Sequence, residues 1–244
     1  MKYIDLTKED GGSGIVDDKF LPNGTIITVG ASGADFTSVQ DALDYLESKI
    51  SNGNITIHIN AGTYTTSEQL LTKKCNISRL IIEGEENYGS QINTSFVSSY
   101  GALHHEMDYT LELKDFYINF TGTSTNARAI DVYKASKLIL NNVKCTNFPG
   151  VGITCNGNSN IYATLNSTII ITGSNRGLVS IGLFLLDYNV TLSLTDVTTA
   201  ICTSAGGLFH YNSLIRNYTN VTNQTSQTVN TPTNTGLIMG TIQS

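Results

Sequence analysis

The feature that most constrains this chain is a long succession of short stretches in which apolar residues alternate with others. The succession begins at Ile55-Thr-Ile-His-Ile59 and runs toward the C-terminus, with no recurrence of a helical period. Leu111-Glu-Leu113 and Ile169-Ile-Ile171 are typical members. Period-two alternation predicts short β-strands that each bury one face.

The strand groups restart near Ile130, Ile153, Ile181 and Leu208, at intervals of 23, 28 and 27 residues. A loose period in the twenties, with two or three strands per unit, is typical of a β-solenoid, whose turns bury their inner faces against one another. A β-sandwich or jelly roll also has short strands at similar spacing. The sequence has few Asn-Gly or Asp-Gly hairpin turns between neighbouring strands, which favours the solenoid.

One amphipathic helix is predicted, over residues 36–50, before the strands begin. Thr37-Ser-Val-Gln40 fits a capping box at its start. The open end of a solenoid exposes apolar core and strand edges, so this helix is expected to cap it. Its apolar stripe consists of Phe36, Val39, Ala42, Leu43, Leu46 and Ile50.

Three segments are predicted: an irregular arm over residues 1–24, a β-helix domain over 25–216 that includes the capping helix, and a C-terminal segment over 217–244. The last of these is rich in Asn and Thr up to Thr235 and can bury little by itself. We therefore expect it to become ordered in a homo-oligomer.

The composition excludes several classes of protein. The formal net charge is −6 and only 14% of the residues are charged, so the chain lacks the basic surface that nucleic-acid binding requires. The longest apolar stretch, Ser180 to Leu186, is too short to cross a membrane. The first ten residues lack the apolar core of a signal peptide.

The four cysteines, Cys75, Cys145, Cys155 and Cys202, are scattered without metal-binding spacing. Buried thiols are the expected outcome, and neither a metal nor a cofactor is predicted.

Two segments near the N-terminus carry a family resemblance. The stretch from Val29-Gly-Ala-Ser-Gly to Gln40-Asp-Ala-Leu43, followed by Ile55-Thr-Ile-His-Ile-Asn-Ala-Gly-Thr-Tyr64, resembles the start of pectin-lyase-like right-handed β-helix proteins. That superfamily includes pectinesterases, polysaccharide lyases and hydrolases, and bacteriophage tail spikes and tail fibres. The resemblance implies a right-handed parallel β-helix with an N-terminal capping helix.

The opening is most similar to pectinesterases and their phage relatives, but the catalytic motifs of pectinesterases are missing. Thr65-Thr66 stands where those enzymes have a glutamate after the Gly-x-Tyr motif, and the Arg-Pro-Trp segment has no counterpart, since the chain contains no Trp. Fold and chemistry are separable, so the fold expectation remains.

The densest group of ionisable residues is His104-His-Glu-Met-Asp108. On a strand, Glu106 and Asp108 would share one face and could act as a general acid and base on a sugar, whereas His104 and His105 would point to opposite faces. We favour the alternative that this group is an exposed loop between solenoid turns. The spacing matches no metal-binding motif.

A second set of carboxylates, Asp131, Asp187 and Asp196, lies on or near strands of successive turns. Stacked on one outer face, they could form a glycosidase-like cluster. Solubilising charges at outward positions are the favoured alternative.

Five tyrosines are candidate glycan-binding residues, because exposed aromatic rings can stack on sugars. The alternative is that they cover the wall or contact a neighbouring subunit. His58 lies at an outward position and is expected to be structural. The five are Tyr117, Tyr133, Tyr162, Tyr188 and Tyr211.

The resemblance and the missing catalytic motifs together favour a phage or prophage tail or baseplate-associated protein. Its expected partners are a bacterial surface polysaccharide and other tail proteins, and its expected location is a virion assembled in the bacterial cytoplasm. A homotrimer is expected by analogy with tail spikes. The alternatives are a polysaccharide lyase, hydrolase or esterase and a structural spacer without a ligand.

Overall fold

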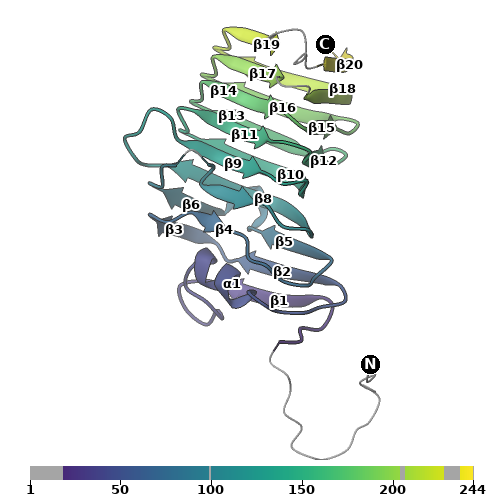
Figure 1. Ribbon diagram of the computed structural model, residues 1–244. Coiled ribbons are helices and arrows are strands. Elements are labelled where there is room, and N and C mark those ends of the chain that lie inside the picture. Colours follow the sequence, from purple (N-terminus) through teal and green to yellow (C-terminus); the bar gives the residue numbers. More distant parts are fainter. Residues whose placement is uncertain (1–18, 99, 204–206, 228–236, 244) are drawn as a thin grey trace, which may run out of the picture.

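A computed structural model describes residues 19–98, 100–203, 207–227 and 237–243. The chain forms a β-solenoid in which each strand pairs in parallel with strands of the neighbouring turns (Figure 1). Three walls surround one continuous apolar core. This arrangement confirms the predicted β-solenoid.

The strands divide among three walls. The first wall contains β1 (Thr25–Val29), β2 (Asn54–Ile59), β5 (Arg79–Glu83), β12 (Asn160–Ala163), β15 (Leu183–Leu186) and the first halves of β8 (Thr110–Phe120), β10 (Lys137–Thr146) and β18 (Leu208–Thr219). The second wall contains β3 (Gly62–Thr66), β6 (Ser90–Thr94), β13 (Thr168–Thr172), β16 (Val190–Thr195) and the second halves of β8, β10 and β18. The third wall contains β4 (Leu70–Leu71), β7 (Leu103–His105), β9 (Arg128–Val132), β11 (Val151–Cys155), β14 (Arg176–Ser180), β17 (Thr199–Thr203) and β19 (Asn223–Gln227).

Identical register along each wall stacks apolar side chains into continuous inner rows. On the third wall, Ile130 pairs with Ile153, as the restart positions predicted, and the row continues through Leu178. Ile181 and Leu208 do not belong to this row, because Ile181 follows β14 and Leu208 begins β18 on the first wall. On the first wall the inner row consists of Ile55, Leu80, Leu111, Leu138, Ile161, Phe184 and Phe209.

The corner between the second and third walls depends on residues with left-handed backbone. Asn147, Gly173, Asp196 and Asn220 follow strands of the second wall and have φ values of 62°, 70°, 54° and 53°. The amides of Asn147, Gly173 and Asp196 bond to the turn above, for example Gly173 N to Thr195 O at 2.9 Å. Asn, Asp and Gly tolerate this conformation better than other residues.

A second column of left-handed residues marks the corner between the first and second walls. It consists of Asp115, Asn142, Asn166 and Asn189. The Asn142 side-chain amide donates to Asp115 Oδ1 at 3.1 Å, and that of Asn189 donates to Asn166 Oδ1 at 3.3 Å. The two corner columns give a structural role to five asparagines: Asn142, Asn147, Asn166, Asn189 and Asn220.

The helix is shorter than predicted. α1 spans Val39–Tyr45, and Ser38 rather than Thr37 is its N-cap, accepting from the Asp41 amide at 3.0 Å. Phe36 and Ile50 have helical spacing, but both form β-bridges, Phe36 with Val29 and Ile50 with Phe20 and Asn76. α1 lies beside β1 at the N-terminal end of the stack (Figure 1) and buries Val39, Ala42 and Leu43.

The predicted segment boundaries do not coincide with breaks in the solenoid. β18 runs across the boundary at 216, β19 pairs with β17, and β20 (Leu237–Gln243) pairs with β18. The described strands of the C-terminal segment therefore continue the solenoid of their own chain. Residues 1–18 of the predicted arm lie outside the described residues, and the Leu21 amide bonds to Ile50 O at 2.8 Å within the first turn.

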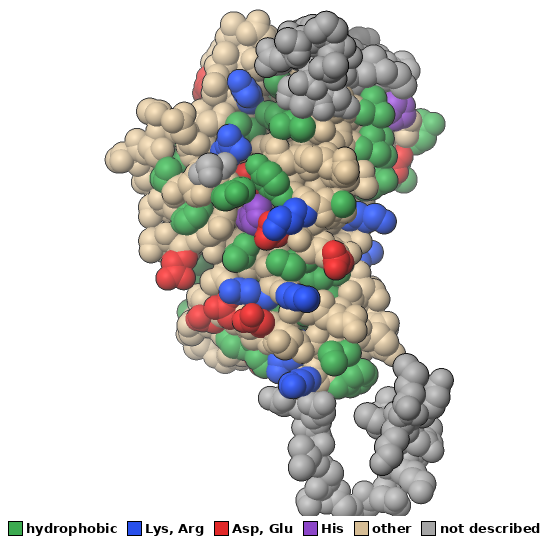
Figure 2. All heavy atoms as spheres, in the orientation of Figure 1, with side chains coloured by type: hydrophobic (Ala, Val, Ile, Leu, Met, Phe, Trp, Pro, Cys, Tyr) green, Lys and Arg blue, Asp and Glu red, His purple; other side chains and the backbone are tan. Residues whose placement is uncertain are grey.

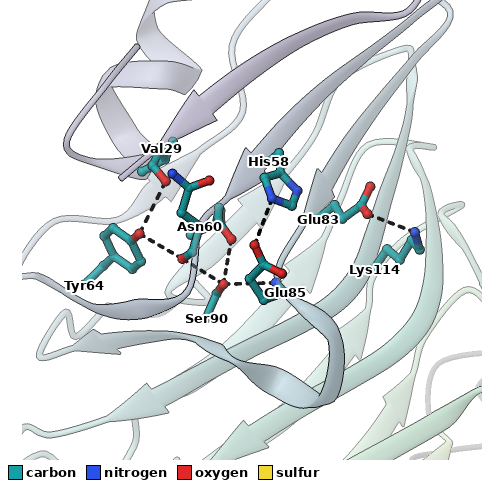
Figure 3. Close-up of polar contacts among 9 residues, drawn as sticks. Val29, His58, Asn60, Tyr64, Glu83, Glu85, Ser90 and Lys114 are labelled. Carbon is teal, nitrogen blue, oxygen red and sulfur yellow. Dashed lines mark hydrogen bonds and ion pairs between the residues drawn. The ribbon is translucent and has the colours of Figure 1, made fainter. Parts of the chain in front are cut away.

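Tyr64, from the Gly-x-Tyr motif, joins two successive turns at a corner (Figure 3). Its hydroxyl lies 2.9 Å from Asn60 O and 3.3 Å from Val29 O. The Ser90 hydroxyl lies 2.9 Å from the same Asn60 oxygen and accepts from the Glu85 amide at 3.0 Å. The motif therefore has a structural role in this chain.

Among the described residues, no helix has the length and apolar character needed to cross a lipid bilayer.

Replacing Gly173 tests the corner requirement. Gly173→Asn is expected to leave stability nearly unchanged, because Asn and Asp occupy the equivalent corners above and below. Gly173→Val is expected to lower the free energy of unfolding by about 1–3 kcal/mol, because a β-branched residue is strained at positive φ. Urea denaturation of both variants measures the difference, and equal effects would contradict the explanation.

Tyr64→Phe tests the hydroxyl contact between turns. The variant leaves two carbonyl groups without this donor and is expected to lose about 0.5–1.5 kcal/mol of stability. Tyr45→Phe, on the exposed side of α1, is the matched control. A Tyr64→Phe protein that denatures at the same urea concentration as the control would show that the contact contributes nothing.

Candidate functional site

β7 places the two adjacent histidines on opposite sides of the third wall, as predicted. His105 points into the core and His104 to the outer face. The predicted exposed loop is wrong for the histidines, because both are buried. Glu106 and Asp108 lie in the connection between β7 and β8, not on a strand, so the shared strand face expected for these carboxylates does not exist.

His105 is a buried structural residue. Its Nδ1 lies 3.1 Å from the Thr72 hydroxyl, and its Nε2 lies 3.1 Å from the Tyr109 carbonyl oxygen. A carbonyl can only accept, so Nε2 carries the proton and Nδ1 accepts from Thr72. Burial lowers the pKa of His105 to about 4, although the bond to Tyr109 opposes this shift.

His104 is the centre of an aromatic group on the outer face. Its ring centroid lies 4.9 Å from that of Tyr100 and 5.4 Å from that of Tyr133, and the two tyrosine rings are 5.4 Å apart. His104 Nε2 lies 3.3 Å from Glu106 Oε2, which also pairs with Lys134 Nζ at 3.0 Å. The hydrogen bond from Lys134 is the main cause that lowers the pKa of Glu106.

Asp131 lies next to His104 in the same outer row, since the two residues are register partners in β9 and β7. Its side chain is 0% exposed, and neither carboxylate oxygen makes a hydrogen bond within the described part of the chain. Arg128 Nη1 lies 3.8 Å from Asp131 Oδ2. Burial raises the pKa of Asp131, while the nearby Thr154 hydroxyl and the Arg128 charge oppose the rise.

A polar hollow of about 530 Å³ lies beside this group, where β9, β11 and β14 begin. None of the described residues that line it is acidic. Arg128 and Arg176 align along the wall with Val151 between them, because Val151 pairs with both. The polar residues that line it are Ser98, Ser124, Asn126, Arg128, Asn175 and Arg176.

Figure 2 shows the face that carries the third wall. A histidine lies near the middle of it, with basic and acidic side chains beside it, and uncharged surface covers most of the rest. We call the ring group of Tyr100, His104 and Tyr133 together with the arginine hollow the third-wall site. It combines aromatic rings, amide and hydroxyl groups and two guanidinium groups.

The five predicted tyrosines do not share one surface. Tyr117 lies on the second wall, Tyr162 on the first, and Tyr188 at the corner before β16; only Tyr133 belongs to the third-wall site. Tyr211 is not on the surface at all, with 7% exposure. It pairs with Leu186 in an inner row of the first wall and packs on Phe209, so the alternation of Phe209 and Tyr211 was the signal for burial.

The three candidate aspartates, Asp131, Asp187 and Asp196, do not lie together on one surface either. Asp187 is exposed after β15 and accepts from the Tyr188 amide at 2.8 Å. Asp196 has φ 54° at a corner and accepts from the Asn220 side chain at 2.8 Å. Corner geometry explains both positions, and the three aspartates form no stack. The favoured alternative of outward solubilising charges agrees with the exposed Asp187 and Asp196 but is wrong for Asp131, which is buried.

The aromatic and polar residues of the site that were missed from the sequence are Tyr100, Ser98, Ser124, Asn126, Arg128, Asn175 and Arg176. The sequence signal is an asparagine shortly before each arginine, in Asn126-Ala-Arg128 and Asn175-Arg176. The two arginines can be recognised as neighbours only when the turns are aligned by their strand register.

Among the described residues, no group of three or more His, Cys, Asp and Glu side chains could hold a metal ion. None of the four cysteines, all within the described part of the chain, forms a disulfide. His58 lies on the outer face of the first wall, 3.2 Å from Glu85 (Figure 3).

His105 makes a testable contribution to the pH dependence of stability. Its lowered pKa means that the unfolded chain binds a proton below about pH 6.5 and the folded chain only near pH 4. Stability is therefore unaffected above pH 6.5 and falls as the pH drops toward 4. Between pH 7.5 and 5.0 the loss from this residue is about 2 kcal/mol.

Urea denaturation of the native protein and of His105→Leu at both pH values measures this effect. The variant is less stable at pH 7.5, since Thr72 and Tyr109 lose a partner, but it loses less stability on acidification. The same acid-induced loss in both proteins would contradict the assignment.

Comparison of the chain with protein-family models, with curated proteins and with solved structures gave no match.

Proposed function

We propose that this protein recognises a bacterial surface glycan through the third-wall site, as a tail or baseplate-associated component of a phage or prophage particle. The observation that carries the proposal is the juxtaposition of the Tyr100, His104 and Tyr133 rings with a polar hollow on one wall. The resemblance of residues 25–64 to pectin-lyase-like proteins, phage tail spikes among them, supports the particle assignment.

The chemistry of the site suits a sugar. Sugars present an apolar ring face and several hydroxyl groups, which match an aromatic surface with nearby amide, hydroxyl and guanidinium groups. Tyr100 is 45% exposed and offers the accessible ring of the group. Asn126 and Asn175 supply both donors and acceptors beside it.

Two architectural features belong to the same proposal: the solenoid is right-handed, and α1 caps its N-terminal end. The burial of Val39, Ala42 and Leu43 beside the first strands supports the cap. We also propose a homotrimer, in which the outer row of Ile139, Tyr162 and Leu185 on the first wall contacts a neighbouring subunit. A stable monomer in sedimentation at micromolar concentration would contradict the trimer.

A polysaccharide-active enzyme is the alternative, and the site geometry gives it less support. Asp131 has no exposed surface to offer a substrate, and Glu106 is held by Lys134. A reducing-sugar assay and an unsaturated-product assay on each bound glycan separate recognition from catalysis, and absence of both binding and product supports a spacer.

Binding to a glycan array, followed by affinity measurement on the best ligand, tests the proposed function. Tyr100→Ala is expected to weaken binding about tenfold, the effect of losing one aromatic contact. Tyr188→Ala, at another exposed ring on a distant corner, is the control and is expected to bind normally. Equal affinity of all three proteins, or binding to no glycan, would contradict the site.

A further inference from the structure

The third-wall site has a local charge opposite to that of the chain. The net charge is −6, yet the described residues that line the hollow include two arginines and no carboxylate. Arg128 and Arg176 are separated by two strand spacings along the solenoid axis, which is about 9.6 Å between their backbones. A charge reversal confined to a hollow indicates a ligand of opposite sign.

The two arginines differ in how they are held. Arg128 lies 3.8 Å from the buried Asp131, so part of its charge is already balanced within the protein. Arg176 is exposed and makes no ion pair or hydrogen bond through its side chain within the described part of the chain. Its guanidinium is therefore available to a ligand.

Asp131, behind Arg128 in the same strand, is a second feature that bears on the hollow. Its carboxylate is fully buried, and both of its oxygens lack hydrogen-bond partners among the described residues. A buried carboxylate is costly, and retaining Asp131 at 3.8 Å from Arg128 fixes the position of a cation at the edge of the hollow.

We propose that the glycan bound at this site is an acidic polysaccharide whose carboxylate groups bind Arg176 and Arg128. This inference rests on the proposed function and specifies its ligand. A guanidinium binds a carboxylate through two parallel hydrogen bonds, and the Asn126 and Asn175 amides lie beside the arginines to bind neighbouring hydroxyls. Two arginines aligned along the axis suit a polymer that runs along the wall and carries at least one carboxylate on each disaccharide.

A polyphosphate such as a nucleic acid is a weaker candidate. Its backbone carries dense negative charge, and the net charge of −6 repels such a polymer outside the hollow. Carboxylates spaced by neutral sugar atoms require only the local charge of the hollow.

Titration of the full chain with hyaluronan and alginate, each beside its carboxyl-reduced form, and with dextran tests the inference. The native protein is expected to bind at least one carboxylated polymer, to bind its reduced form at least tenfold more weakly, and to lose affinity with added salt. Reduction changes the carboxylate to an alcohol and leaves the sugar rings intact.

The variants assign the effect to the hollow. Arg176→Gln is expected to bind the carboxylated polymer at least tenfold more weakly than the native protein. Arg176→Lys is expected to have an affinity between those of the native protein and Arg176→Gln, because it keeps the charge and loses the paired hydrogen bonds. Lys137→Gln removes the same charge from an exposed position on the first wall and is expected to bind like the native protein. Thermal unfolding of each variant confirms that it is folded.

The outcomes separate this inference from the proposed function. Equal binding of a polymer and its carboxyl-reduced form, or binding of dextran alone, would overturn the acidic ligand and leave glycan recognition standing. Equal losses in Arg176→Gln and Lys137→Gln would overturn the hollow as the site. Binding of no polymer would overturn the acidic ligand, and absence of any ligand on the glycan array as well would remove the proposed function.

Discussion

In-register parallel pairing between successive turns is the constraint on which the rest of this structure depends. Each strand of a wall must begin and end in line with the strands of the neighbouring turns. Every turn therefore has to change direction at equivalent positions. The columns from Asn147 to Asn220 and from Asp115 to Asn189 meet that requirement with left-handed backbone. The inner rows follow from it, because residues at equal positions in successive turns meet the same neighbours across the core.

The same constraint produces the site. Stacking aligns outward residues as strictly as inward ones, so His104, Asp131 and Thr154 form an outer row although they come from three turns. Arg128 and Arg176 are likewise brought onto one line. His104, Arg128 and Arg176 stand on paired strands, which fixes their spacing, and the surface extends along the axis, which suits a polymer better than a compact ligand.

Local pattern was enough to predict a solenoid of short strands, the core face of most strands and the opposite orientations of His104 and His105. It failed where contacts between turns decide the structure. Phe36 and Ile50 have helical spacing, but bridges to Val29 and Phe20 hold them in extended backbone. From sequence spacing, Asp187 and Asp196 could be stacked charges on one wall, but the structure places Asp196 at a corner and Asp187 after the end of β15. The arginine hollow could not be predicted, because Arg128 and Arg176 are aligned only through their common pairing with Val151. No local sequence motif contains that register.

The distance along the chain between stacked partners varies, although the stack itself does not. Leu80 and its partner Leu111 are 31 residues apart, whereas Leu138 and Ile161 are 23 apart. The surplus residues lie in connections outside the core, such as the segment that carries Tyr100. A connection can therefore lengthen or change composition over evolutionary time without altering the packing beneath it. In such an architecture, ligand preference and foldability can evolve almost independently.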